Sequence, residues 1–137
     1  MGRPVVHFEI ECRDGERTRD FYSRMFDWRI NVIPDNPAEY GLIDQADNGA
    51  GIGGAVTVVP AVPSSTYRGL RRDEGHAGQV TVFVQVPDVE QALVRAEQLG
   101  GQRVQGPDPM GPGMVFGKFT DLEGQLIGVV SGSYGAS

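Results

Sequence analysis

Two segments of the chain, residues 7–14 and 81–88, alternate hydrophobic and polar residues with a period of two. Such alternation predicts a β-strand with one face on a hydrophobic layer. Each segment ends at an aspartate, Asp14 or Asp88, which suits a helix N-cap because its carboxylate accepts orphan backbone N–H groups. Hydrophobic residues spaced as on one face of a helix follow both aspartates. The alternating apolar residues are Phe8, Ile10 and Cys12 in the first segment and Val82, Val84 and Val86 in the second.

The two strands open an internal repeat with an offset of 74 residues, so that Thr81 falls on His7. Each copy continues with a helical segment and then with three further strand-like segments. The copies also close alike, since Gly54 falls on Gly128 at the same offset. Each copy therefore predicts the order strand–helix–strand–strand–strand.

The segment between the copies is rich in Pro, Ser and Gly, which is typical of a linker. We expect two βαβββ modules at about residues 4–60 and 78–131, with the linker at 61–77, in a single α+β domain over residues 1–137. The conformation of residues 105–115, rich in Pro and Gly, does not follow from the pattern. The linker residues Arg68, Arg71, Arg72 and His76 are expected on a solvated surface.

Charge and cysteine content restrict the partners and the location. The chain has 12 Lys+Arg against 18 Asp+Glu, a net charge of −6. Nucleic acid and anionic membranes attract a basic face, so neither is an expected partner. No apolar run approaches the roughly 20 residues of a membrane span. The single cysteine, Cys12, is expected in the core, excludes a disulfide framework and favours a cytoplasmic protein.

Five short motifs follow one another along the chain. They are His7-x-x-Ile10-x-Cys12-x-Asp14, Phe21-Tyr22-x-x-x-Phe26-x-Trp28, Val84-x-Val86-x-Asp88-Val89, Gly100-Gly101 and Asp121-Leu122-Glu123-Gly124-Gln125. As an ordered set they resemble the vicinal oxygen chelate superfamily, which includes glyoxalase I, extradiol dioxygenases and bleomycin-resistance proteins. The resemblance covers about residues 4–131 and is strongest to short, single-domain glyoxalase-related members. It implies two βαβββ modules that form a curled mixed sheet around a cup-shaped site.

The resemblance also implies where a metal would bind. Enzymes of the superfamily hold a divalent metal with one residue from the first and last strand of each module. The corresponding positions here are His7, Gly54, Thr81 and Gly128. Only His7 is a strong donor, and catalytic metal sites keep about three protein ligands. We therefore expect no cofactor, and a divalent metal only if this mapping is wrong.

Alternation along the strands predicts what else lines the cup. If His7 faces it, Glu9 and Glu11 do too. The two glycines would let a ligand approach the backbone, and apolar walls with a few polar groups are typical of a small-molecule pocket. The expected ligand-binding residues are His7, Glu9, Glu11, Gly54, Val56, Thr81, Phe83, Gln85, Leu126 and Gly128, with Val130 on the same face.

The candidate catalytic residues are His7 and Glu9, because residues i and i+2 on a strand share one face and can exchange a proton with a substrate. His7 is alternatively a polar residue hydrogen-bonded inside the cup, and Glu9 and Glu11 are alternatively solvated at its mouth. The glycine run at residues 49–54 matches a dinucleotide-binding pattern, but the β-branched segment after it predicts a strand where such a site needs a helix.

These features favour a metal-free protein of the glyoxalase/bleomycin-resistance type that sequesters or senses a small organic molecule. The alternative is a lyase, isomerase or dioxygenase-like enzyme that uses His7 and Glu9, or a displaced divalent metal held by Glu9, Glu11 and Gln85. A homodimer is expected, because exposed sheet edges invite pairing and resembling proteins of this length form two-fold dimers. The modules could pair within one chain or across two. The candidates for the buried dimer surface are Val56, Val58 and Val130.

Overall fold

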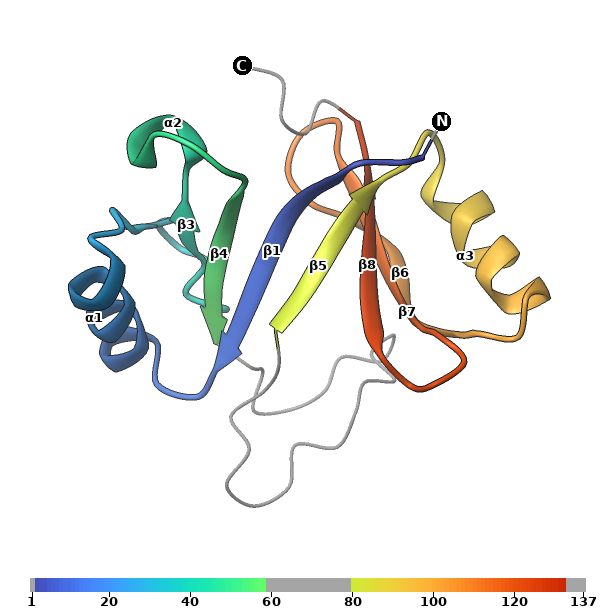
Figure 1. Ribbon diagram of the computed structural model, residues 1–137, viewed down its shortest axis with the longest axis horizontal. Helices are drawn as coiled ribbons and strands as arrows, with labels where there is room; N and C mark the ends of the chain where they lie inside the picture. Colours follow the sequence, from blue (N-terminus) through green and yellow to red (C-terminus); the bar gives the residue numbers. More distant parts are fainter. Residues whose placement is uncertain (1, 59–79, 133–137) are drawn as a thin grey trace. The chain divides into compact units, whose positions relative to one another are not determined.

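Strands and helices form a mixed α+β fold, as predicted (Figure 1). The computed structural model describes residues 2–58 and 80–132, so the predicted linker with its arginines and His76 lies outside the described residues. The described residues divide into two compact units, one of residues 7–58 with Val80 and one of residues 2–6 and 81–132. No helix of the described ranges is long and apolar enough to cross a membrane.

The first module has four strands in the order β2-β3-β4-β1, with β4 parallel to β1 and antiparallel to β3. A long helix follows β1, and a one-turn helix that the pattern did not predict lies between β3 and β4. The elements are β1 (Val5–Cys12), α1 (Gly15–Phe26), β2 (Asn31–Val32), β3 (Gly41–Ile43), α2 (Gln45–Asn48) and β4 (Gly53–Val58).

Helix α1 begins where the capping aspartate predicts. The side chain of Asp14 accepts a hydrogen bond from the backbone N–H of Arg17 at 3.0 Å. The helix ends at Asp27, whose φ of 57° is the left-handed conformation that stops helices and that aspartate tolerates better than most residues. Between these ends, Tyr22 packs on a buried cluster of Cys12, Ile43 and Val56.

The second module repeats this plan without the extra helix. Its strands lie in the order β5-β8-β7-β6, with β8 parallel to β5 and antiparallel to β7. The side chain of Asp88 caps α3 by accepting from the backbone N–H of Gln91 at 2.9 Å. The elements are β5 (Val80–Gln85), α3 (Val89–Gln98), β6 (Gln102–Pro109), β7 (Val115–Thr120) and β8 (Leu126–Ser131).

A buried cluster of Val89, Leu93 and Val129 joins α3 to its sheet. Arg103 of β6 adds ion pairs to the same helix, at 2.7 Å to Glu90 and 3.3 Å to Glu97. The hydrogen bond to Glu90 raises the pKa of Arg103 above its ordinary value, so this guanidinium stays charged. The strand β6 also includes residues 105–109, the first part of the segment 105–115 whose conformation the sequence pattern left open.

The sequence offset between corresponding elements of the two modules is not constant along the chain. The helices start 74 residues apart, at Gly15 and Val89, but the closing strands start 73 residues apart, at Gly53 and Leu126. Since side chains alternate along a strand, a difference of one residue exchanges the two faces. The residue of β4 that corresponds to Gly128 is therefore Ala55, which pairs with Glu9 as Gly128 pairs with Phe83.

Candidate functional site

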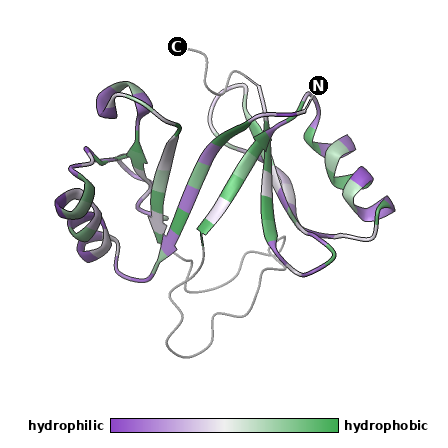
Figure 2. Cartoon of the chain, in the orientation of Figure 1, coloured by the Kyte–Doolittle hydropathy of each residue, from purple (hydrophilic) through white to green (hydrophobic). Residues whose placement is uncertain are grey.

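The strand β1 separates apolar from polar side chains, and the two kinds alternate along its ribbon in Figure 2. Phe8, Ile10 and Cys12 pack in the cluster under α1, so His7, Glu9 and Glu11 lie on the opposite face. We call that side, with Tyr40 and Ala55, the helix-free face of the first module. His7 is 1% exposed and Glu9 is 6% exposed, so both polar groups are withdrawn from water.

The hydroxyl of Tyr40 links the imidazole of His7 to the carboxylate of Glu9. It lies 2.8 Å from Nε2 of His7 and donates a hydrogen bond to Oε2 of Glu9 at 3.0 Å. The direct distance between Nε2 and Oε2 is 3.9 Å, so the phenol is the bridge. A phenol has one proton. Because that proton goes to Glu9, the oxygen accepts from His7, and Nε2 is the protonated nitrogen in this arrangement.

The position of Tyr40 follows from the strand that it precedes. Leu42 of β3 pairs with Ala55, and Ala55 pairs with Glu9, so these residues share a face. Tyr40 lies two residues before Leu42 and points to the same side, and its carbonyl accepts a hydrogen bond from the N–H of Ile33 at 2.9 Å. The sequence analysis did not identify Tyr40. The alternation of Tyr40 and Leu42 with core residues was a signal, but β3 has only three residues.

Two residues expected on this face lie on the other one. Val56 is fully buried in the cluster under α1, and a Cβ atom added at Gly54 would lie 2.5 Å from the ring of Phe8. The prediction that Gly54 and Val56 face the cup was wrong, because the offset of 74 residues does not hold for the closing strands. Ala55 and its neighbour on the same face, Thr57, occupy those positions instead.

The second module has a different surface opposite α3. Thr81, Phe83 and Gln85 of β5 lie there with Leu126, Gly128 and Val130 of β8, which is the facing that the alternation predicted. Phe83 is fully buried. The centroid of its ring lies 6.5 Å from the ring centroid of Phe116 and 5.8 Å from Nζ of Lys118. We call this the helix-free face of the second module.

Gly128 leaves room for a side chain of the protein itself. A Cβ atom added there would collide with the ring of Phe83, so the missing side chain accommodates Phe83. Thr81 is also buried, and its Oγ1 has no hydrogen-bond partner among the described residues. The glycine at position 128 was expected to let a ligand approach the backbone. The close contact with the ring of Phe83 is a simpler structural reason for a glycine there.

The positions that hold a metal in the resembling enzymes carry few donors here. In the first module, His7 bonds to Tyr40 through Nε2, and Ala55 has no donor atom. In the second, Thr81 offers a hydroxyl and Gly128 offers nothing. No group of three or more His, Cys, Asp or Glu side chains that could hold a metal occurs within the two described ranges. This donor set does not fit a resident divalent metal, which needs about three protein ligands.

Cys12 lies in the core of the first module, as expected. Burial raises the pKa of its thiol, since a thiolate would be poorly solvated there, and a hydrogen bond with the side chain of Thr18 offsets part of this rise. A thiol with a raised pKa is a poor nucleophile. Cys12 therefore belongs to the packing and not to the chemistry of the site.

Solved structures of similar fold include a methylmalonyl-CoA epimerase in complex with methylmalonyl-CoA and NH4+. It has a TM-score of 0.61 and 16% sequence identity over 96% of this chain and 95% of that one. The methylmalonyl-CoA epimerase from Mycobacterium tuberculosis gives 0.60 and 15%, over 93% and 87%. A glyoxalase/bleomycin resistance protein/dioxygenase superfamily member from Vibrio splendidus 12B01 gives 0.55 and 14%, over 95% and 99%. At these identities the likeness concerns the fold.

No curated protein matches the sequence. The model of the Glyoxalase/Bleomycin resistance protein/Dioxygenase superfamily matches residues 5–129, which includes every strand and helix up to the middle of β8. This is the family that the ordered motifs predicted. The chain belongs to the glyoxalase/bleomycin resistance protein/dioxygenase superfamily.

Proposed function

We propose that this chain is a metal-free small-molecule-binding protein of the glyoxalase/bleomycin-resistance type, which sequesters or senses a small organic ligand. The observation that carries the proposal is the partly buried chain of hydrogen bonds from His7 through Tyr40 to Glu9. Hydrogen bonds within the protein already orient these groups, and a small-molecule site needs a few polar groups held in a fixed orientation.

The donor set supports the metal-free part of the proposal. One of the two imidazole nitrogens of His7, Nε2, is hydrogen-bonded to a phenol at 2.8 Å. Replacing that bond with a metal bond would also take away from the Tyr40 oxygen the hydrogen bond that His7 donates to it. A small organic ligand is within the range of the fold, because a similar structure is a complex with methylmalonyl-CoA.

An acid–base enzyme, such as a lyase or isomerase, is the second candidate, and Tyr40 favours it. When His7 is an imidazolium, its Nε2 proton can pass to the Tyr40 oxygen while the Tyr40 proton passes to Glu9. The result is a neutral imidazole, an intact phenol and a neutral carboxylic acid, without movement of heavy atoms. Such a chain could take a proton from a substrate at one end and return one at the other.

The metal content of the protein tests the proposal first. We expect protein purified without chelator to contain far less than one divalent ion per chain by elemental analysis. Calorimetric titration with Zn²⁺, Ni²⁺ or Mn²⁺ should show no tight site, and Tyr40→Phe, which leaves Nε2 of His7 without the phenol, should bind Zn²⁺ no more weakly than the wild type. One tightly held ion per chain would overturn the metal-free proposal.

Ligand binding tests the site. A thermal-shift screen of small organic acids, aromatic compounds and acyl-CoA esters, methylmalonyl-CoA included, should yield compounds that stabilise the wild type. Their binding should weaken in Tyr40→Phe and His7→Gln, while Tyr22→Phe, a matched change under α1, should leave it unchanged. If hits bind equally to all four proteins, the ligand does not use this face.

Exchange of substrate protons separates the two candidates. In deuterated water, a binder leaves the exchangeable C–H of a bound compound such as methylmalonyl-CoA at its spontaneous rate of exchange. An enzyme accelerates that exchange, and His7→Gln and Tyr40→Phe reduce it. Acceleration that survives in both variants would count against the His7–Tyr40–Glu9 chain as the proton carrier.

A further inference from the structure

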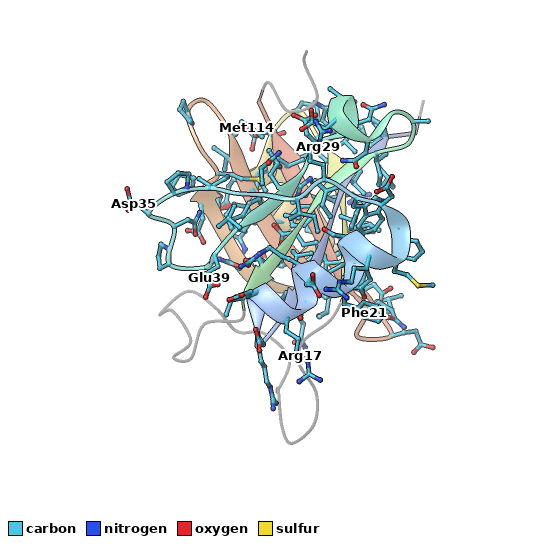
Figure 3. The ribbon with its side chains drawn as sticks, turned by 90° about the vertical axis from the view of Figure 1, so that its left-hand side faces the viewer. Arg17, Phe21, Arg29, Asp35, Glu39 and Met114 are labelled. Carbon is cyan, nitrogen blue, oxygen red and sulfur yellow. The ribbon has the colours of Figure 1, made fainter. Side chains whose placement is uncertain are left out.

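The loop that carries Tyr40 has an unusual backbone. It joins β2 to β3, and its residues Asp35 and Glu39 have φ angles of 57° and 47°. This left-handed conformation is disfavoured for residues with a side chain, and more for glutamate than for aspartate. Figure 3 shows Asp35 at the tip of the loop and Glu39 nearer to α1. Glu39 directly precedes Tyr40, so contacts that hold Glu39 in this conformation also affect the phenol.

Hydrogen bonds hold the backbone on either side of Glu39. The carbonyl of Ala38 accepts from the backbone N–H of Val58 at 2.7 Å, and the carbonyl of Tyr40 accepts from that of Ile33 at 2.9 Å. The peptide group between Glu39 and Tyr40 lies between these two anchors. Rotation of this one peptide group would swing the phenol away from its position.

The side chain of Arg19, from α1, contacts that peptide group. Its Nη1 donates a hydrogen bond to the carbonyl oxygen of Glu39 at 3.5 Å and lies 3.6 Å from Oε1 of the same residue. An exposed ion pair by itself contributes little stability. The Arg19 side chain, however, is only 17% exposed and contacts both the backbone and the carboxylate of Glu39. It therefore restrains the conformation of this residue.

Two glycines leave the space that Arg19 occupies. A Cβ atom added at Gly15 would lie 2.5 Å from Nη1 of Arg19 and 3.0 Å from Oε1 of Glu39, and one added at Gly41 would lie 2.8 Å from Cδ of Arg19. Each would also come close to one apolar side chain. Neither glycine has a positive φ, so the backbone conformation does not require glycine at either position. The enclosed arginine gives a reason for both.

We propose that Arg19 is a positioning residue for the chain of hydrogen bonds through Tyr40. Its guanidinium fixes the peptide group between Glu39 and Tyr40, and so keeps the phenol between the imidazole of His7 and the carboxylate of Glu9. The helix α1 covers the opposite side of the sheet from these two groups, so Arg19 acts through the loop. This inference rests on the proposed function, because it concerns the same site.

Exchange of the His7 ring proton with water tests this role without a ligand. The chain has two histidines, so in His76→Gln protein every imidazole N–H signal in an NMR spectrum belongs to His7. His7 is 1% exposed and bonded to the Tyr40 hydroxyl, so its Nε2 proton should exchange slowly. In Arg19→Met the exchange should be at least about 10-fold faster, because the loop opens more often. Arg24→Met removes another ion-paired guanidinium from α1 and, as the control, should leave the rate unchanged.

The double variant R19M/Y40F separates positioning of the phenol from general support of the module. Tyr40→Phe alone removes the acceptor of the His7 proton and should give the fastest exchange. If Arg19 acts through the phenol, adding Arg19→Met should then change the rate less than about two-fold. A further increase of about 10-fold in the double variant would overturn the proposal, because Arg19 would then support the module as a whole.

Gly15→Ala repeats the test with Arg19 present. The added Cβ atom displaces the guanidinium, so exchange of the His7 proton should accelerate as in Arg19→Met, and combining the two changes should add nothing. Unchanged exchange in both single variants would refute the positioning role and leave ligand binding untouched. A ligand screen without hits would instead count against the proposed function and leave these exchange rates as they are.

Discussion

The two modules have one plan of elements and opposite chemistry on their helix-free faces. The first gathers His7, Glu9 and Tyr40 in a chain of partly buried hydrogen bonds. The second buries Phe83 beside Phe116 and places the ammonium of Lys118 over its ring. The comparison teaches that the fold prescribes which positions lie on this face but not whether they carry polar or aromatic groups. The candidate functional groups therefore lie on the helix-free face of the first module, whereas the same face of the second module is packed with aromatic side chains.

A contact between phenylalanine and glycine occurs in both modules, on the helix side in the first and on the helix-free face in the second. Phe8 covers Gly54 on the side of α1, whereas Phe83 covers Gly128 on the side away from α3. In each case the absent side chain leaves space for a ring on the neighbouring strand. The same pair of residue types therefore builds the core in one module and the helix-free face in the other.

The largest expected effect comes from removing the ring on the helix-free face of the second module. Phe83→Ala should lower the free energy of unfolding by about 3–5 kcal/mol, because Phe83 is fully buried and leaves a cavity. Phe8→Ala should lower it less, since Phe8 is only partly buried. Urea denaturation of the two variants measures both losses. Equal losses would mean that the helix-free face of the second module is not a packed core.

Filling the glycines should also separate the modules. Gly128→Ala should lower the free energy of unfolding by about 1–3 kcal/mol, because the enclosed ring of Phe83 has to shift. Gly54→Ala should cost less, since the partly exposed ring of Phe8 can move outward. Adding Phe83→Leu to Gly128→Ala should recover part of the loss in a double-mutant cycle. Strict additivity of the two changes would contradict the close contact between them.

The polar chain of the first module should depend on its bridge. Tyr40→Phe should lower the free energy of unfolding by about 1–3 kcal/mol, because it removes the hydrogen bonds from buried His7 and Glu9. Tyr22→Phe, an equal chemical change under α1, should stay within about 0.5 kcal/mol of the wild type. Similar effects of the two variants in thermal or urea unfolding would show that the bridge contributes no net stability.

The buried hydroxyl of the second module should behave in the opposite way. Thr81→Val removes an oxygen that lacks a hydrogen-bond partner among the described residues. We expect a change between zero and about 1 kcal/mol of added stability, since an unsatisfied buried hydroxyl disfavours folding. The free energies of unfolding of Thr81→Val and Tyr40→Phe, each compared with the wild type, show whether the two hydroxyls have opposite effects on stability. A clear loss of stability in Thr81→Val would indicate a partner for this hydroxyl.

The smallest effect concerns Cys12, whose place in the second module is taken by Val86. Burial raises the pKa of the Cys12 thiol above its unfolded value, so the folded protein holds this proton more tightly. Its contribution is fully present at neutral pH and is lost as the pH rises from about 8.5, where an unfolded thiol ionises. Cys12→Val should remove this decline in stability at alkaline pH. Free energies of unfolding of the variant and the wild type, measured at several pH values, test this. A decline of the same size in the variant would have to come from other groups.

Local patterns in the sequence determined the strands that begin each module, their facing, and the helix starts at Asp14 and Asp88. These features depend on neighbours a few residues apart, because alternation and capping act over short distances. The weak donor set was also evident, since Thr81 and Gly128 lack strong donors in any conformation. The sequence also supplied the family, through motifs whose order extends along nearly the whole chain.

Only the tertiary structure decided the rest of the site. Forty residues lie between β1 and β4, so the register of these strands depends on packing and not on local pattern. A shift of one residue turned Gly54 and Val56 to the helix side. Tyr40 reaches His7 across 33 positions of the sequence. Such contacts depend on how distant strands align, which short-range periodicity does not encode.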